Sequence, residues 1–174
     1  AGGGGLTLSI ARGFENLLKL KKIEHFPKIH CVQPLGNDTM ASAIRKGLNG
    51  GKEVQCKTEI SGLQVPNLLD ADDVINHLKN RTGIGHLVED QFVFGIQKAL
   101  ASDEGIFCEP AGATALAGLY GATKRKEVGS DDHIICLITG LAFKDTVSLH
   151  KTASSGKLYN MKHDQFSTEL SNLY

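Results

Sequence analysis

The sequence has 174 residues, with 19 basic and 19 acidic side chains and a formal net charge of zero. Because neither sign forms long blocks, neither nucleic acid nor an anionic membrane is expected as a partner. No apolar run approaches membrane-spanning length and no secretory signal opens the chain, so we expect a cytoplasmic or organellar enzyme. The cysteines form no CxxC pair and are expected to be buried free thiols: Cys31, Cys56, Cys108 and Cys136.

The first half of the chain is expected to hold two helices and a short strand. Apolar residues recur at spacings of three and four through residues 6–20, directly after four glycines, and this spacing predicts a helix. A strand is expected at 28–33, where an apolar stretch lies between two prolines. Asn37 or Asp38 is placed to cap a second helix over 39–48.

The second half continues the alternation of helices and strands. The patterns predict three helices: one at 70–79 with Asp70 as its N-cap, one from Asp90 to a stop at Gly105, and one at 111–122. They also predict strands at 84–88 and 134–138. The continuous apolar run at 134–138 is typical of a strand covered on both faces. The alternation favours an α/β fold with a mostly parallel twisted sheet and helices on both faces. A polar tail at 149–174 is expected to end in a short helix over 164–174.

The opening glycines, Gly2, Gly3, Gly4 and Gly5, precede an amphipathic helix without any intervening side chain. Backbone N–H groups at the positive end of a helix form a site for a phosphate, and small residues let the phosphate reach the backbone. A glycine run at a chain end is also typical of a linker. Both interpretations are open on this feature alone.

Other phosphate and metal motifs are disfavoured. A dinucleotide fold is disfavoured because Thr7 takes the place of the third glycine and Gln33 ends the strand that should carry an acidic ribose ligand. A nucleoside-triphosphate loop is excluded because the Gly51-Lys52 step is followed by Glu53 instead of serine or threonine. The histidines and cysteines are scattered, so no metal site is expected.

Two segments near the carboxy-terminal end carry a specific sequence pattern. Residues 109–119 read EPAGATALAGL after EGI at 104–106, and they are similar to the EGI-x-x-EPAGA-x-x-LAGL segment of fold-type-II pyridoxal-phosphate enzymes. Residues 137–145 read LITGLAFKD and resemble the LTGHGLKD segment of threonine synthases, with two departures in the middle.

Three further segments resemble the same superfamily and follow in its order. Residues 2–6 are similar to the GGGGL phosphate loop of threonine and serine dehydratases, and 58–63 to a TIADG-like segment. Residues 88–90 stand where a VSDEE helix start is expected. The chain therefore resembles the carboxy-terminal half of the threonine synthase and threonine dehydratase superfamily, which is tryptophan synthase beta-like. The glycine loop favours the dehydratases and the segment around Thr139 favours threonine synthase.

The resemblance implies a site for pyridoxal 5'-phosphate. Its phosphate would bind the backbone of the loop residues Gly2, Gly3, Gly4, Gly5 and Leu6. Thr139 stands where the family offers a neutral hydroxyl to the pyridine nitrogen, unless its hydroxyl only caps the following turn. Glu109 would face the cofactor, cap the helix that begins near Ala111, or both. Gly62 would permit close backbone approach to the cofactor, or form a plain turn.

The resemblance also implies what this span lacks. The Schiff-base lysine of the family lies upstream of the glycine loop, so no catalytic residue is expected here, and Lys144 should be a packed or solvent-facing side chain. Residues 1–148 would form the carboxy-terminal part of the cofactor-binding domain. The implied whole enzyme is a homodimer that binds a small amino-acid substrate and converts O-phosphohomoserine to threonine and phosphate. A threonine or serine dehydratase, and a non-catalytic domain that binds phosphate or a partner chain, are the alternatives.

Overall fold

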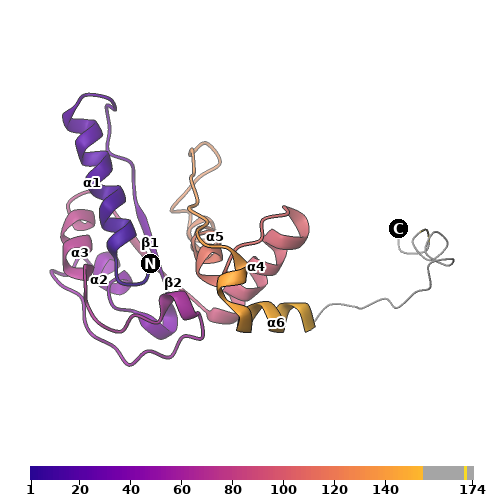
Figure 1. The fold of residues 1–174 in the computed structure, drawn as a ribbon. Coiled ribbons are helices and arrows are strands. Elements are labelled where there is room, and N and C mark those ends of the chain that lie inside the picture. The colour runs from indigo at the N-terminus through magenta and orange to yellow at the C-terminus, as the bar shows by residue number, and fades with distance from the viewer. Residues whose placement is uncertain (155–170, 172–174) are drawn as a thin grey trace.

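The structure is a computed structural model that describes residues 1–154 and 171. Figure 1 shows its elements, which are α1 (Gly5–Lys19), β1 (His30–Pro34), α2 (Ala41–Lys46), α3 (Ala71–Lys79), β2 (Ile84–Val88), α4 (Asp90–Asp103), α5 (Pro110–Lys124) and α6 (Thr146–Ser154). Three short 3-10 helices lie between them, η1 (Leu35–Asn37), η2 (Ser61–Leu63) and η3 (Ala142–Lys144). Within the described residues, no helix has the length and apolar character needed to cross a bilayer.

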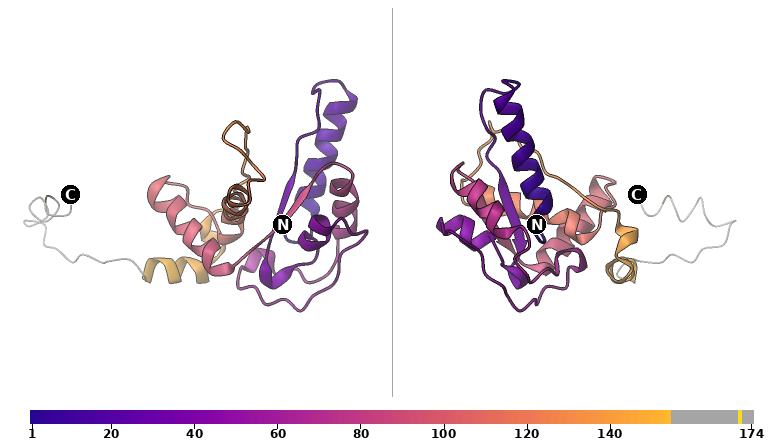
Figure 2. Two further views of the ribbon diagram at one scale, coloured as in Figure 1. Left: turned by 180° about the vertical axis from the view of Figure 1, so that it is seen from behind. Right: turned by 60° about the vertical axis from the view of Figure 1, so that its left-hand side comes forward.

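Strands β1 and β2 run side by side in the same direction at the centre of the fold. Their register runs from His30 opposite Ile84 to Pro34 opposite Val88. Because successive side chains of a strand point to opposite faces, Cys31 packs into a core with α1, α2 and α3 while the next residue packs into a core with α4 and α5. Figures 1 and 2 show these two groups of helices on opposite sides of the strands. The predicted α/β fold is confirmed.

The helix predicted at 39–48 is shorter than expected. Residues 39 and 40 form a bend before the helix, with Met40 as its N-cap, and Gly47, with φ of 65°, ends α2 early. Of the two predicted caps, Asp38 acts on this helix, because its Oδ1 accepts the N–H of Ser42 at 2.9 Å. Asn37 instead donates its amide to the carbonyl of Val65 at 2.8 Å.

Other predicted features fall close to their expected places. The stop at Gly105 is confirmed, since its φ of 66° lets the following N–H donate to Leu100 at 2.8 Å. All the cysteines are free as predicted, but only Cys31 and Cys108 are buried, and the other two are partly exposed. Helix α6 runs across the expected boundary at 148. The terminal helix predicted at 164–174 lies outside the described residues, apart from residue 171.

The strand predicted at 134–138 is not formed. The run is extended, and the side chains of Ile134, Ile135 and Leu137 are 43%, 83% and 47% exposed. A strand requires backbone hydrogen bonds to a neighbouring strand, and the described residues hold one sheet, made of β1 and β2 alone. The prediction was wrong for this chain because apolar character identifies a segment that can be buried in a sheet and does not supply the strand beside it.

A polar cluster around the buried His86 joins α2, both strands and the end of α5. The rings of His30 and His86 are stacked with centroids 4.9 Å apart, and His30 Nδ1 lies 2.8 Å from His86 Nε2. Arg45 and Arg125 place guanidinium nitrogens 3.2 and 2.5 Å from His86 Nδ1. A guanidinium can only donate, so His86 accepts at Nδ1 and donates through Nε2 to His30. Glu127 pairs with both arginines, at 2.7 and 3.0 Å.

This arrangement keeps His86 neutral. Burial, with the nearby His30 and Arg45, lowers its pKa to about 4, although Glu127 acts in the opposite direction. Burial and Lys28 likewise lower the pKa of His30. Protonation at Nδ1 of His86 would set an N–H against two guanidinium groups.

We therefore predict that stability falls as the pH drops from 6.5 to about 4. In this window the unfolded His86 takes up a proton and the folded one does not, so the free energy of unfolding decreases by at most about 3 kcal/mol. Urea unfolding near neutral pH and near pH 4 should show that the free energy of unfolding falls less for His86→Gln than for the parent chain. His133→Gln, at an exposed histidine, should lose as much as the parent, and equal losses in all three proteins would contradict this role.

Candidate cofactor-binding site

The glycine loop, residues 2–5, leads directly into α1. Gly4 is the N-cap of α1 with φ of 104°, a left-handed conformation that favours glycine. Its carbonyl accepts the N–H of Leu8 at 2.9 Å, and the Gly3 carbonyl accepts that of Asp70 at 3.0 Å. Within residues 1–154 the N–H groups of residues 5–7 have no acceptor, and the first turn holds no acidic residue. These free donors at the positive end of a helix suit an anion such as phosphate.

One exposed carboxylate lies beside this loop. Asp70 is the N-cap of α3 as predicted, but its side chain makes no capping hydrogen bond there. Its Oδ2 lies 3.2 Å from the position that a Cβ would take on Gly5. The negative charge stabilises the start of α1 and opposes a second anion. Any phosphate held here must therefore be held by backbone hydrogen bonds rather than by side-chain charge.

Gln33, the next-to-last residue of β1, fixes the loop to the rest of the fold. Its fully buried Oε1 accepts the N–H groups of Met40 and Ala41 at 2.8 and 2.9 Å. Its Nε2 donates to Thr39 Oγ1 at 2.9 Å and to the Gly2 carbonyl at 3.4 Å. Sequence reasoning treated Gln33 only as a missing acidic ligand and overlooked this role. The sequence signal for this role was a polar residue at the end of an apolar strand, a few residues before a helix begins.

The predicted site residues from the middle and end of the chain lie next to this loop. Gly62, in η2, has its carbonyl 3.4 Å from the Cβ position of Gly2, and its own Cβ position lies 3.1 Å from Ala111 Cβ. The next residue along α5, Gly112, would place a Cβ 2.1 Å from the carbonyl oxygen of Thr139. The structure therefore links Gly2, Gly62 and Thr139 through the first turn of α5, while Gly4 and Gly5 lie against Asp70.

Thr139 and Glu109 flank the turn that follows the run at 134–138. Thr139 is exposed, and its hydroxyl has no hydrogen-bond partner among the described residues, so it does not cap the following turn. Glu109 is the N-cap residue of α5, yet its side chain makes no capping hydrogen bond. A Cβ on Gly140 would lie 2.1 Å from Glu109 Oε1, so the carboxylate lies against this turn instead. Lys144, one turn further on, is exposed.

Two carboxylates hold the loop that carries Gly62. Asp90 accepts the hydroxyl of Thr58 at 2.8 Å and the N–H of the next residue at 2.6 Å. Asp145 accepts the hydroxyl of Ser61 at 3.0 Å and two hydrogen bonds from Ser148 at 3.0 Å. Burial would raise the pKa of Asp145, but these hydrogen bonds lower it below its usual value. Sequence reasoning missed both roles because the partners are distant along the chain.

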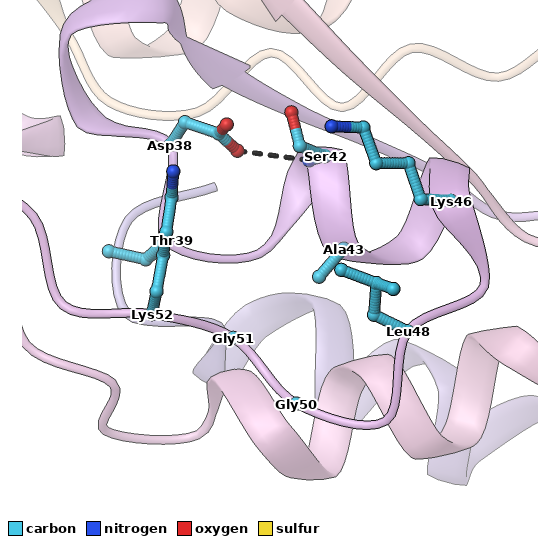
Figure 3. Close-up of a pocket in the computed structure, with 9 residues that line it drawn as sticks. All are labelled: Asp38, Thr39, Ser42, Ala43, Lys46, Leu48, Gly50, Gly51 and Lys52. Atoms are coloured by element: carbon cyan, nitrogen blue, oxygen red, sulfur yellow. Dashed lines mark hydrogen bonds between the residues drawn. The ribbon is translucent and has the colours of Figure 1, made fainter.

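A shallow cavity of about 170 Å³ lies apart from these residues, on α2 and the loop after it. Figure 3 shows its lining, with Lys46 and Lys52 on opposite sides and Asp38 turned toward Ser42. None of the predicted site residues lines this cavity. In the glycine loop, Gly4 is buried, Gly2 and Gly3 are partly buried and Gly5 is exposed.

Comparison with known proteins decides the family. A model of the family described as pyridoxal-phosphate dependent enzyme matches residues 1–140 of this chain. The chain belongs to this family. The threonine synthase of Methanosarcina acetivorans is 28% identical over 145 residues, which cover 83% of this chain and 36% of that protein. The threonine synthase of Methanocaldococcus jannaschii is also 28% identical, over 148 residues with the same coverage. The chain thus spans about a third of the length of these relatives.

Solved structures show the same fold. The processed form of threonine deaminase isoform 2 from Solanum lycopersicum matches with a TM-score of 0.67 and 21% identity, covering 91% of this chain and 43% of that one. An L-serine ammonia-lyase from Rhizomucor miehei matches with a TM-score of 0.69 and 18% identity, covering 89% and 48%. The resemblance seen in the sequence motifs is confirmed.

Two buried glutamines provide a test of the role of Gln33. Gln33→Met should destabilise the chain by about 2–3 kcal/mol, because the buried N–H groups of Met40 and Ala41 lose their acceptor. Gln97 in α4 is the matched control: its Oε1 already lacks a partner among the described residues, and its Nε2 makes one bond of 2.9 Å to Cys108. Gln97→Met should therefore cost only about 1 kcal/mol. Equal free energies of unfolding for the two variants would contradict the assignment.

Proposed function

We propose that this chain is the carboxy-terminal part of the cofactor-binding half of an enzyme that acts on a small amino-acid substrate. The observation that supports the proposal is the contact of Gly62 with both Gly2 and Ala111, beside the contact of Gly112 with Thr139 at the start of α5. Among members of the family we favour a threonine synthase, which converts O-phosphohomoserine to threonine and phosphate. Support comes from the two relatives of that name and from the sequence around Thr139.

The residues present fit pyridoxal 5'-phosphate. The free backbone N–H groups at the start of α1, from the glycines and Leu6, would hold the phosphate. Thr139, whose hydroxyl has no partner among the described residues, would face the pyridine nitrogen as a neutral group. Glu109 would orient that turn, and Gly62 would leave room for the backbone approach. When bound, the cofactor withdraws electrons from the α-carbon of an amino acid, and the protein sets how strongly through the group at the ring nitrogen.

The proposed site does not include the lysine to which the cofactor is attached in this family. Lys144 belongs to the carboxy-terminal KD pattern, lies on η3 and is exposed. We therefore propose that residues 1–174 have no activity by themselves and that the whole enzyme, a homodimer, needs polypeptide that supplies the lysine and much of the substrate site. Residues 1–148 would be the cofactor-binding part and 149–174 a tail.

Two other functions have support of their own. The glycine loop resembles that of the dehydratases, and the structural neighbours are a threonine deaminase and a serine ammonia-lyase, so a lyase of that type is the second candidate. The third is a non-catalytic domain that binds phosphate or a partner chain. Its support is the row of free N–H groups at the start of α1, which suits a phosphate without any catalytic residue.

Chemical trapping and product analysis separate these functions. Residues 1–174 incubated with pyridoxal 5'-phosphate and borohydride should give no stoichiometric adduct at a defined lysine, and such an adduct at Lys144 would overturn the assignment. A protein extended to the full length of the relatives should form threonine from O-phosphohomoserine. Formation of 2-oxobutanoate or pyruvate from threonine or serine would instead establish the dehydratase, and absence of any turnover would favour the non-catalytic domain.

A further inference from the structure

The loop that follows α2 contains the only Asn-Gly step in the sequence, Asn49-Gly50. Both residues lie outside helices and strands, and Asn49 is exposed while Gly50 is partly exposed. Figure 3 shows Gly50 and Gly51 along this loop. The backbone nitrogen of the residue after an asparagine can attack the carbon of its side-chain amide. Glycine hinders this attack least, because it has no Cβ and rotates freely about its backbone bonds.

The two groups that would react are free of hydrogen bonds within residues 1–154. The N–H of Gly50 has no acceptor there, and Nδ2 of Asn49 has no partner there. Neither group therefore has to give up a hydrogen bond before the Gly50 nitrogen reaches Cγ of Asn49.

The side-chain oxygen of Asn49, by contrast, is held by a cation. Lys79, the last residue of α3, donates a hydrogen bond from Nζ to Asn49 Oδ1. Attack on Cγ moves negative charge onto this oxygen, and a positive group placed there stabilises the charge as it develops. Because Lys79 is exposed, solvent screens it, so its effect on the rate is about five-fold at most.

Helix α3 also holds the peptide that carries the attacking nitrogen. Asp72, in its first turn, accepts the N–H of Gly51 at 2.8 Å. Its Oδ1 lies 3.2 Å from the position that a Cβ would take on Gly50. The attacking nitrogen and the cation at Asn49 Oδ1 are therefore positioned by the same helix.

We propose that Asn49 is a site of spontaneous deamidation promoted by Lys79. The Gly50 nitrogen forms a bond to Asn49 Cγ and passes its proton to water, while the side-chain nitrogen takes up a proton and leaves as ammonia. Water then opens the resulting cyclic imide at either carbonyl, which gives aspartate or isoaspartate at position 49. The reaction needs water alone, and the inference does not rest on the proposed function.

The isoaspartate product would disturb the segment that supports the glycine loop. An isoaspartyl linkage adds a methylene group to the backbone at position 49. The chain just beyond it has little room to shift, because a Cβ on Gly51 would lie 2.3 Å from the carbonyl oxygen of Thr39. Thr39 Oγ1 accepts a hydrogen bond of 2.9 Å from Gln33, which also contacts Gly2. The modification therefore acts on the residues that hold Gln33.

Peptide mapping by mass spectrometry, combined with enzymatic methylation of isoaspartate, tests the site. Residues 1–174 are incubated in mildly alkaline buffer and sampled over time. We expect the side-chain NH₂ of Asn49 to be replaced by OH before any other asparagine in the chain reacts, with isoaspartate in the same peptide. An unmodified Asn49, or earlier modification of another asparagine, would overturn the proposal.

Substitutions of exposed residues test the role of Lys79. Lys79→Met should slow the reaction about three- to five-fold and leave the melting temperature unchanged. Gly50→Ala should slow it more, because a Cβ restricts the approach of the nitrogen. Lys46→Met is the matched control, since Lys46 is an exposed lysine beside Gly50 in the same cavity and makes no hydrogen bond with Asn49. It should react at the parent rate, and equal rates for the two lysine variants would contradict the assistance by Lys79.

Amide chemical shifts of the purified isoaspartate form test its effect on the fold. We expect the amides of Met40 and Lys52 to shift from their parent positions, because Met40 donates to Gln33 and Lys52 to the Thr39 carbonyl. Asn49→Asp is the control, since it has the same added charge and an unchanged backbone length, and it should leave Met40 unshifted. Parent-like shifts at Met40 in the isoaspartate form would contradict the connection to Gln33.

Discussion

Close backbone contact between segments far apart in the sequence is the constraint on which the candidate site depends. The carbonyl of Gly62 lies against Gly2, Gly62 lies against Ala111, and Gly112 lies against the carbonyl of Thr139. A side chain at Gly112 would overlap the backbone at Thr139, so glycine is needed there for packing as much as for any ligand. The same contacts that close the fold therefore link Gly2, just before the free N–H groups of α1, through Gly62 and the start of α5 to the turn that carries Thr139.

Hydrogen bonds from polar side chains fix the segments that meet at the start of α5. Gln33 fixes the glycine loop to the start of α2, while Asp90 and Asp145 fix the loop that carries Gly62. Each of these groups is paired with a backbone N–H or a hydroxyl, so the supporting structure keeps its own charges and donors occupied. What it leaves free is the positive end of α1 and the Thr139 hydroxyl. A preorganised site for a phosphate and a pyridine ring would require such free groups held in place by paired ones.

The fold was predictable where the signal is local. The helix at α1, the stop at Gly105 and the hydrogen bond from the start of α2 to Asp38 follow from residue types and spacing. The run at 134–138 was not predictable as unpaired, because strand formation depends on a neighbour rather than on the run itself. Gln33 was missed for a similar reason, since its partners at Gly2 and Thr39 belong to other segments.

The central claim is that the backbone amides at the start of α1 form an anion site in line with Thr139. Its most direct test is a titration of 15N-labelled chain with pyridoxal 5'-phosphate, pyridoxal and inorganic phosphate, followed by amide chemical shifts. We expect both phosphate compounds, but not pyridoxal, to shift the amides of residues 3–7, and only pyridoxal 5'-phosphate to shift Thr139 as well. Shifts confined to the cavity beside Lys46 and Lys52, or equal responses to pyridoxal and its phosphate, would contradict the account.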